Sequence, residues 1–315
     1  MDFGFPLQLE PAGFSRLLGI SIAEAAEHLA DFRFDFSYRN LTAGERDKII
    51  IQILDKIDSS DLGLSGPNAV GRWEKGWQEN LDSFTAGGFD VHELIPKYIR
   101  PNQPVRLFGD YVMPQDPNFE LNLFTVLRAW LFKEYLSGAE HIFEFGCGPA
   151  YNLVELARMY PDKKLHGLEW VSPPLEIIRL LAEKRGYKIT GQLFDMFVPD
   201  DDLAVGPNSA FLAIWSLEQL GERFEKFLQF SLQKSPAIFV HVDAFLEFCR
   251  PNNLSDYLAL KHNLRRSYLR GYLTRLYALE AEGKIEIIKA HKVECGGLYH
   301  DAHSYVVWRP KKVNR

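Results

Sequence analysis

The segment from His141 to Ala150 constrains the fold more than any other part of the sequence. It reads His-Ile-Phe-Glu-Phe-Gly-Cys-Gly-Pro-Ala, an apolar strand that ends in an acid and a Gly-x-Gly turn. Glycines let the backbone approach a ligand without a Cβ in the way, and the helix predicted to follow begins with unpaired N–H groups. The segment therefore predicts a strand, a turn and a helix at which a nucleotide-like ligand binds.

The residue that follows the turn separates two classes of nucleotide-binding protein. Dinucleotide domains need a third small residue, in the pattern G-x-G-x-x-G/A. Counted from Gly146, that position is Tyr151, whose bulk would obstruct close packing of helix and strand. An NAD-dependent oxidoreductase is therefore the less favoured alternative.

The pattern Glu144-x-Gly146-x-Gly148 resembles motif I of the class I S-adenosylmethionine-dependent methyltransferases. That family usually has a third glycine where this chain has Ala150. The resemblance implies that S-adenosyl-L-methionine is the cofactor. It also implies that Glu144 faces the amino-acid end of the cofactor, beside Gly146, Cys147 and Gly148.

Three later segments extend the resemblance in the same order along the chain. A second apolar segment ends at Glu169, 21 residues after Gly148, near the distance at which a strand-end carboxylate reaches a ribose. A third segment carries an acid where the family contacts the adenine, and the buried run 210–215 has the composition of a fourth strand. The resemblance thus gives the further cofactor contacts as Glu169, Trp170, Asp195, Met196 and Trp215.

The remaining apolar runs complete an α/β fold. Segments 237–242, 284–293 and 304–308 have the composition of strands. By the resemblance we expect a doubly wound, seven-stranded, mostly parallel sheet whose last strand is antiparallel, plus a mainly helical N-terminal domain. We expect residues 1–118 to form that lid or substrate domain. Residues 119–315 would form the methyltransferase domain, with a helical insertion at about 245–282.

Helix signals are clear in the N-terminal region. Two capping boxes, Ser21 with Glu24 and Thr42 with Glu45, predict helix starts. A third helix should end at Gly87-Gly88, and the irregular, proline-punctuated stretch 96–117 should lead to the domain boundary. This third helix carries a stripe that we expect to pack in the core, with an aromatic wall for substrate as the alternative: Trp73, Trp77, Leu81 and Phe84.

Composition excludes several classes of function. A formal net charge of −6 and a pI near 5.9 argue against a broad phosphate-binding surface, so we expect no nucleic-acid partner. No apolar run has transmembrane length and the start lacks signal-peptide features, so we expect a cytoplasmic protein without membrane contact. Three scattered cysteines without a CxxC pair predict neither disulfides nor structural zinc.

The resemblance implies methyl transfer by in-line displacement, for which a general base is the open question. Ligands of open α/β sheets bind beyond the carboxyl ends of parallel strands, which points to Glu218, His241 and Asp243. The loop 296–303 should reach the same edge and adds His300 and His303. His241 could instead be a core histidine and Asp243 a helix cap. A metal site at the loop histidines is not favoured.

The expected acceptor is a small molecule, methylated at oxygen in preference to nitrogen. Arg266 and Arg270 lie one helical turn apart and would suit an anionic acceptor, with a solvated helix face as the alternative. The layout is similar to that of bacterial sugar O-methyltransferases. A non-catalytic cofactor-binding module that contacts other proteins is the alternative from another class. No sequence feature sets an oligomeric state.

Overall fold

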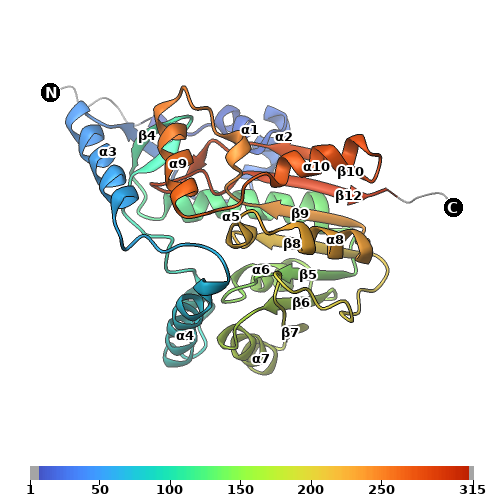
Figure 1. The fold of residues 1–315 in the computed structure, drawn as a ribbon. Coiled ribbons are helices and arrows are strands. Elements are labelled where there is room, and N and C mark those ends of the chain that lie inside the picture. The colour runs from blue at the N-terminus through green and yellow to red at the C-terminus, as the bar shows by residue number, and fades with distance from the viewer. Residues whose placement is uncertain (1–6, 312–315) are drawn as a thin grey trace.

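The larger of two sheets has seven strands. In the computed structural model, which describes residues 7–311, the strand order is β10-β12-β9-β8-β5-β6-β7 (Figure 1). Strands β5 to β9 run parallel to their neighbours, and β12 is antiparallel to both β9 and β10. The predicted α/β sheet with an antiparallel last strand is confirmed. The bounds are β5 His141–Phe145, β6 Lys164–Glu169, β7 Ile189–Leu193, β8 Ser209–Ile214, β9 Ile238–Val242, β10 Ile285–His291 and β12 Tyr305–Pro310.

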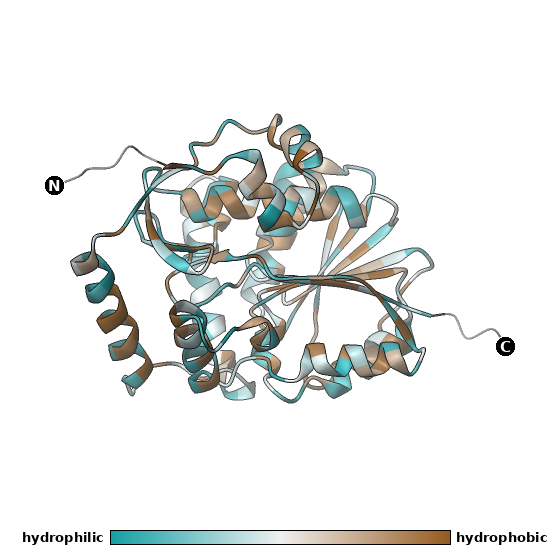
Figure 2. Ribbon diagram, turned by 90° about the horizontal axis from the view of Figure 1, so that it is seen from above, coloured by the Kyte–Doolittle hydropathy of each residue, from teal (hydrophilic) through white to brown (hydrophobic). Residues whose placement is uncertain are grey.

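Helices cover both faces of this sheet because successive strand residues face opposite sides. Ile142 of β5 belongs to a core shared with α5, α6 and α7, whereas Phe143 and Phe145 belong to a core shared with α8 and α10. Figure 2 shows the hydrophobic strands running between these helices. The helix bounds are α5 Phe119–Leu131, α6 Tyr151–Met159, α7 Pro173–Arg185, α8 Glu225–Lys234, α9 Leu254–Arg265 and α10 Tyr272–Ala281.

The N-terminal region contains a second sheet as well as helices. Its antiparallel order is β1-β2-β4-β3-β11, and its last strand comes from the C-terminal part of the chain. The expectation of a mainly helical region was therefore incomplete. The strands are β1 Leu7–Gln8, β2 Ser37–Asn40, β3 Val105–Leu107, β4 Asp110–Pro114 and β11 Cys295–Gly296, and the helices are α1 Pro11–Leu18, α2 Ile22–Leu29, α3 Ala43–Asp58 and α4 Val70–Ala86.

Part of the predicted irregular connection is a β-hairpin. Strands β3 and β4 are joined by Phe108 and Gly109, which both have positive φ angles, of 54° and 87°. Two positive φ angles are the requirement of a two-residue hairpin turn whose twist matches that of the strands. Glycine meets this requirement without strain, but phenylalanine gives no sequence signal for it.

The helix boundaries follow the sequence signals closely. Both capping boxes are present at the starts of α2 and α3, and α4 ends immediately before Gly87. Gly271, with φ 81°, lies between α9 and α10 as the N-cap of α10. Helix α5 continues as one π-helical turn over Phe132–Leu136. Within residues 7–311, none of the helices combines the length and apolarity needed to span a membrane.

Candidate functional site

Two adjoining pockets open where the parallel strands end. The larger has a volume of about 480 Å³ and the smaller about 390 Å³. Gly146 and Trp215, which follow β5 and β8, line both pockets together with Trp73 and Trp77 of α4. Of the nine predicted cofactor contacts, all except Glu144 line at least one pocket: Gly146, Cys147, Gly148, Glu169, Trp170, Asp195, Met196 and Trp215.

The glycine turn has a conformation that side chains disfavour. Gly146, Gly148 and Ala150 have φ angles of 69°, 50° and 61°. A Cβ on Gly146 would lie 2.4 Å from the Cβ of Ser216, and a Cβ on Gly148 would lie 2.9 Å from the ring of Trp77. Ala150, where the family resemblance leads us to expect glycine, adopts the left-handed conformation despite its Cβ.

Glu169 lies at the end of β6 and faces the larger pocket. Its Oε2 accepts a hydrogen bond from the backbone N–H of Gly148 at 2.9 Å, and its Oε1 accepts one from Trp170 N–H at 2.8 Å. Burial raises the pKa of Glu169 to about 7, although both backbone donors favour the ionised form. Each oxygen retains a second acceptor position for a ligand hydroxyl.

Glu144 lies beneath the glycine turn and lines neither pocket. Its Oε1 accepts a hydrogen bond from Asn152 Nδ2 at 2.7 Å, and Asn152 Oδ1 accepts one from Arg128 at 3.0 Å. Burial raises the pKa of Glu144 to about 8, against the lowering effects of Asn152 and Arg128. Asn152 lines the smaller pocket, so Glu144 contributes to that pocket indirectly, by fixing the orientation of the asparagine amide.

The far end of the larger pocket is aromatic, with one acid. Asp195 accepts a hydrogen bond from the N–H of Phe197 at 2.8 Å, which fixes the turn after β7. The rings of Trp170 and Phe197 lie 6.0 Å apart, with 30° between their planes. Met196, which lies between Asp195 and Phe197 in the sequence, also lines this pocket. A carboxylate beside aromatic faces suits a purine with an exocyclic amine.

Two of the base candidates, Glu218 and Asp243, are buried next to each other. Asp243 accepts hydrogen bonds from the N–H groups of Ala244 and Glu218, so its carboxylate ties the end of β9 to the turn Leu217–Leu220. Glu218 accepts a hydrogen bond from Gln219, which lines the larger pocket. Burial raises the pKa of Glu218 to about 7, opposed chiefly by the positive charge of Arg266.

The histidine candidates line neither pocket. His241 is fully buried and accepts a hydrogen bond from Trp308 Nε1 at 2.9 Å; burial lowers its pKa well below the ordinary value. His300 packs against His262, with ring centroids 5.4 Å apart. His303 lies closer to the pockets, since its ring is 5.5 Å from that of Trp215.

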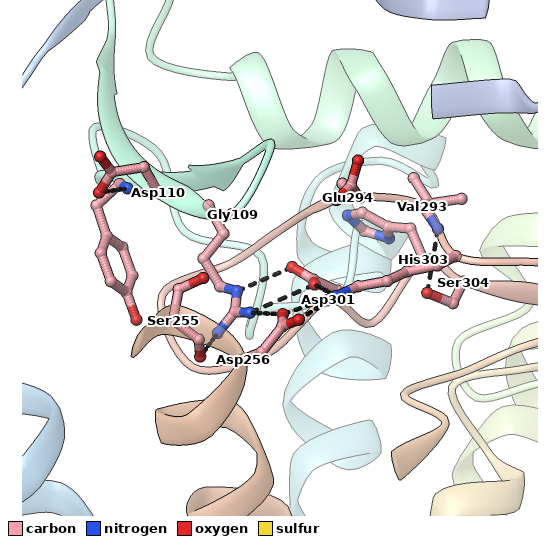
Figure 3. A network of polar contacts seen from close by, with 12 residues as sticks. Gly109, Asp110, Ser255, Asp256, Val293, Glu294, Asp301, His303 and Ser304 are labelled. Carbon is pink, nitrogen blue, oxygen red and sulfur yellow. Dashed lines mark hydrogen bonds and ion pairs between the residues drawn. The ribbon is translucent and has the colours of Figure 1, made fainter. Parts of the chain in front are cut away.

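The loop that carries His300 and His303 is anchored by buried ion pairs. Ser255, Asp256 and Asp301 converge from α9 and from this loop (Figure 3). There, Arg106 of β3 donates to Asp301 at 2.8 Å, to Asp256 at 3.2 Å and to the Ser255 carbonyl at 2.7 Å. Lys292 pairs with Asp256 at 2.6 Å. Among the described residues, no group of three or more histidine, cysteine, aspartate or glutamate side chains is placed to hold a metal ion.

Four residues of the N-terminal region line the pockets, and the sequence analysis favoured none of them as contacts: Trp73, Trp77, Pro96 and Tyr98. Trp73 and Trp77, which we expected in the core, line both pockets, whereas Phe84 of the same stripe is buried in the core. Tyr98 lines the smaller pocket. Desolvation and nearby carboxylates, with Glu218 the strongest, raise the pKa of Tyr98 well above its ordinary value. Only the aromatic stripe of α4 could have signalled these contacts.

The predicted cationic pair does not form an anion site. Arg270 pairs with Glu222 at 3.3 Å on the surface. The guanidinium of Arg266 lies 4.6 Å from the ring centroid of Tyr268. Neither pocket is lined by a lysine or an arginine among the described residues. The charged residues that line the pockets are Glu169 and Asp195, which disfavours an anionic acceptor.

Comparison with known proteins identifies the fold but not a family. No protein-family model matches the chain, and no curated protein is similar to it in sequence. The solved structure of the [4+2]-cyclase SpnF is similar, with 14% identity, a TM-score of 0.52, and coverage of 80% of this chain and 98% of that one.

Two methyltransferase structures are similar at lower scores. Geranyl diphosphate C-methyltransferase from Streptomyces coelicolor A3(2) has 12% identity and a TM-score of 0.46, covering 75% of this chain and 98% of that one. CcbJ methyltransferase from Streptomyces caelestis has 15% identity and a TM-score of 0.43, covering 59% and 89%. The order and direction of the strands and the likeness to SpnF show a Rossmann-like α/β fold, and the likeness extends to the fold alone.

Proposed function

We propose that this protein binds S-adenosyl-L-methionine in the two pockets and transfers its methyl group to a small-molecule acceptor. One observation carries the proposal. The ends of four neighbouring strands, β5, β6, β7 and β8, deliver Gly146, Glu169, Asp195 and Trp215 to one pair of adjoining pockets. A ligand that spans these pockets would have polar groups at both ends, near the acids of the larger pocket and Asn152 of the smaller, and its centre beside the aromatic residues that line both.

The residues present fit this cofactor. Glu169 has acceptor positions for two ribose hydroxyls, and Asp195 can accept from an adenine amine. The glycine turn and Asn152 face the smaller pocket, where the amino-acid end would lie. When bound, the cofactor supplies an electrophilic methyl group. The protein contributes alignment, which can remove roughly 7–11 kcal/mol from the barrier of a reaction between two bound partners.

We propose an acceptor hydroxyl, with Glu218 as the proton acceptor. Its carboxylate is buried and accepts a hydrogen bond from Gln219, which lines the larger pocket. A carboxylate whose pKa is about 7 is suited to general-base work near neutral pH. Tyr98, which stays protonated, would orient the acceptor oxygen by donating a hydrogen bond. In this proposal residues 1–118 supply the acceptor side of the site.

A second candidate is a cofactor-binding protein that transfers no methyl group. The observation in its favour is that no carboxylate or histidine lines the smaller pocket. SpnF, a [4+2]-cyclase, shares this fold. Such a protein would bind the cofactor equally well, and the difference lies only in turnover.

Calorimetric titration tests the proposal at its first step. The protein should bind S-adenosylmethionine and S-adenosylhomocysteine and should not bind NAD. Binding of NAD alone would overturn the proposal. Incubation with methyl-labelled cofactor and a panel of hydroxyl-bearing metabolites then separates the two candidates, because only a methyltransferase moves label into a small molecule.

A further inference from the structure

Four aromatic side chains surround the junction of the two pockets. Trp73 and Trp77 are stacked, with centroids 5.3 Å apart; Tyr98 meets Trp77 edge to face at 6.5 Å, and Trp215 meets Tyr98 edge to face at 5.8 Å. Trp73, Trp77 and Trp215 line both pockets, and Tyr98 lines the smaller one. We call these four residues the aromatic cage.

Hydrogen bonds and close packing hold the aromatic cage in place. The indole N–H of Trp73 donates to Gln219 at 3.2 Å, and that of Trp215 donates to the carbonyl of Ala302 at 2.8 Å. Trp77 rests on Gly148, at a distance that only a residue without a Cβ permits. The indole N–H groups of Trp73 and Trp215 are thus paired within the protein, while the four rings line the pockets.

The electrostatic surroundings of the cage favour a positive charge. Neither pocket is lined by a cationic side chain in the described structure, and both charged lining residues, Glu169 and Asp195, are acids. Aromatic faces attract cations through the negative face of the ring, and cages of this type recognise quaternary ammonium groups. A sulfonium group presents the same features: a permanent charge on a compact, alkylated centre without hydrogen-bond donors.

We infer that the aromatic cage binds the sulfonium cation of S-adenosylmethionine and so makes the protein prefer this cofactor to its neutral product. The inference rests on the proposed function. The larger pocket alone holds Glu169 and Asp195, and the smaller alone holds Gly148 and Asn152. A cofactor with adenosine in the first and its amino acid in the second has its sulfur at the residues that both pockets share.

Titration of the intact protein with three ligands tests the cage without any turnover. S-adenosylmethionine and sinefungin carry a cation at the central position, whereas S-adenosylhomocysteine does not. We expect both cationic ligands to bind about 5- to 30-fold more tightly than S-adenosylhomocysteine. Equal affinity for all three ligands would overturn the inference that the aromatic cage binds the cation, but it would not contradict the proposed function. Absence of binding by any of them would overturn the proposed function itself.

Substitutions within and beside the cage give a matched comparison. Trp77→Leu and Trp73→Leu should weaken S-adenosylmethionine binding while affinity for S-adenosylhomocysteine stays nearly constant, and Trp77→Phe should retain most of the preference. Trp170→Leu alters the larger pocket outside the aromatic cage and should weaken the binding of both ligands equally. Retained binding of S-adenosylhomocysteine shows that a variant is folded. An equal loss of affinity for both ligands in Trp77→Leu and Trp73→Leu would show that these rings contribute only packing, and would overturn the inference.

Discussion

Gly148, which lines the smaller pocket, donates a hydrogen bond from its backbone N–H to the carboxylate of Glu169, which lines the larger pocket, at 2.9 Å. The bond joins the end of β6 to the turn after β5, so the carboxylate is fixed before any ligand arrives. Preorganisation of this kind lowers the entropy that a ligand must give up on binding. The site is thus rigid at the position where a ribose would be recognised.

Glu169→Ala should weaken S-adenosylmethionine binding by about 1–3 kcal/mol, because two ribose hydroxyls would lose a buried acceptor. Isothermal titration calorimetry measures the change. Glu176→Ala, on the exposed face of α7 where Glu176 pairs with Arg179, is the control and should bind as the unaltered protein does. Unchanged affinity in Glu169→Ala would show that the carboxylate does not hold the ribose.

If Glu218 is the base, turnover should rise with pH through an inflection near 7, because the carboxylate accepts a proton only when ionised and its pKa is about 7. Glu218→Gln should lose this inflection and lower kcat by roughly 10²- to 10⁴-fold, with cofactor affinity retained. The exposed Glu222→Gln serves as the control. An unaltered pH profile in Glu218→Gln would assign the base elsewhere.

Ala150→Gly should stabilise the protein by about 0.5–1 kcal/mol, since a φ of 61° is strained for alanine and relaxed for glycine. Urea unfolding of the two proteins gives the difference. The same change at Ala157, inside α6, should destabilise by about 1 kcal/mol or more, because helical glycine is unfavourable. A loss of stability in both variants would mean that the Ala150 methyl group contributes more by packing than its conformation costs.

Arg106→Met should destabilise the fold by about 3–5 kcal/mol, because it removes the buried guanidinium from both Asp256 and Asp301 and leaves Asp301 only the longer pair with Lys292 at 3.5 Å. The exposed pair Arg309 and Glu286 provides the comparison, and Arg309→Met should cost less than about 1 kcal/mol. Chemical denaturation distinguishes the two. Similar small effects would show that Lys292 and Arg250 neutralise the carboxylates unaided.

The sequence predicted the larger sheet well because its signals are local. Long apolar runs such as 210–215 belong to strands buried on both faces, and β8 is buried along its whole length. Glu144 and Glu169 lie within the last two residues of β5 and β6, so the fold determines the edge at which they lie. For the same reason most predicted cofactor contacts line the pockets.

The N-terminal sheet could not be predicted in this way. Its strands are two to five residues long, too short for an alternating pattern, and β11 pairs with a strand far away in the sequence. The hairpin turn at Phe108 has a residue that rarely marks such turns. Trp73 and Trp77 were misassigned because a helical aromatic stripe has the same spacing whether it faces the core or a pocket.

The pairing of β11 with β3 also governs the order in which this protein can be completed during synthesis. One edge of β3 pairs with β4, whereas on its other edge residues 106 and 107 pair with Cys295 and Gly296, which the ribosome makes near the end of translation. Until then β3 has an open edge of unpaired backbone groups that could recruit another chain. The nascent N-terminal half therefore carries an exposed strand edge that the finished protein covers.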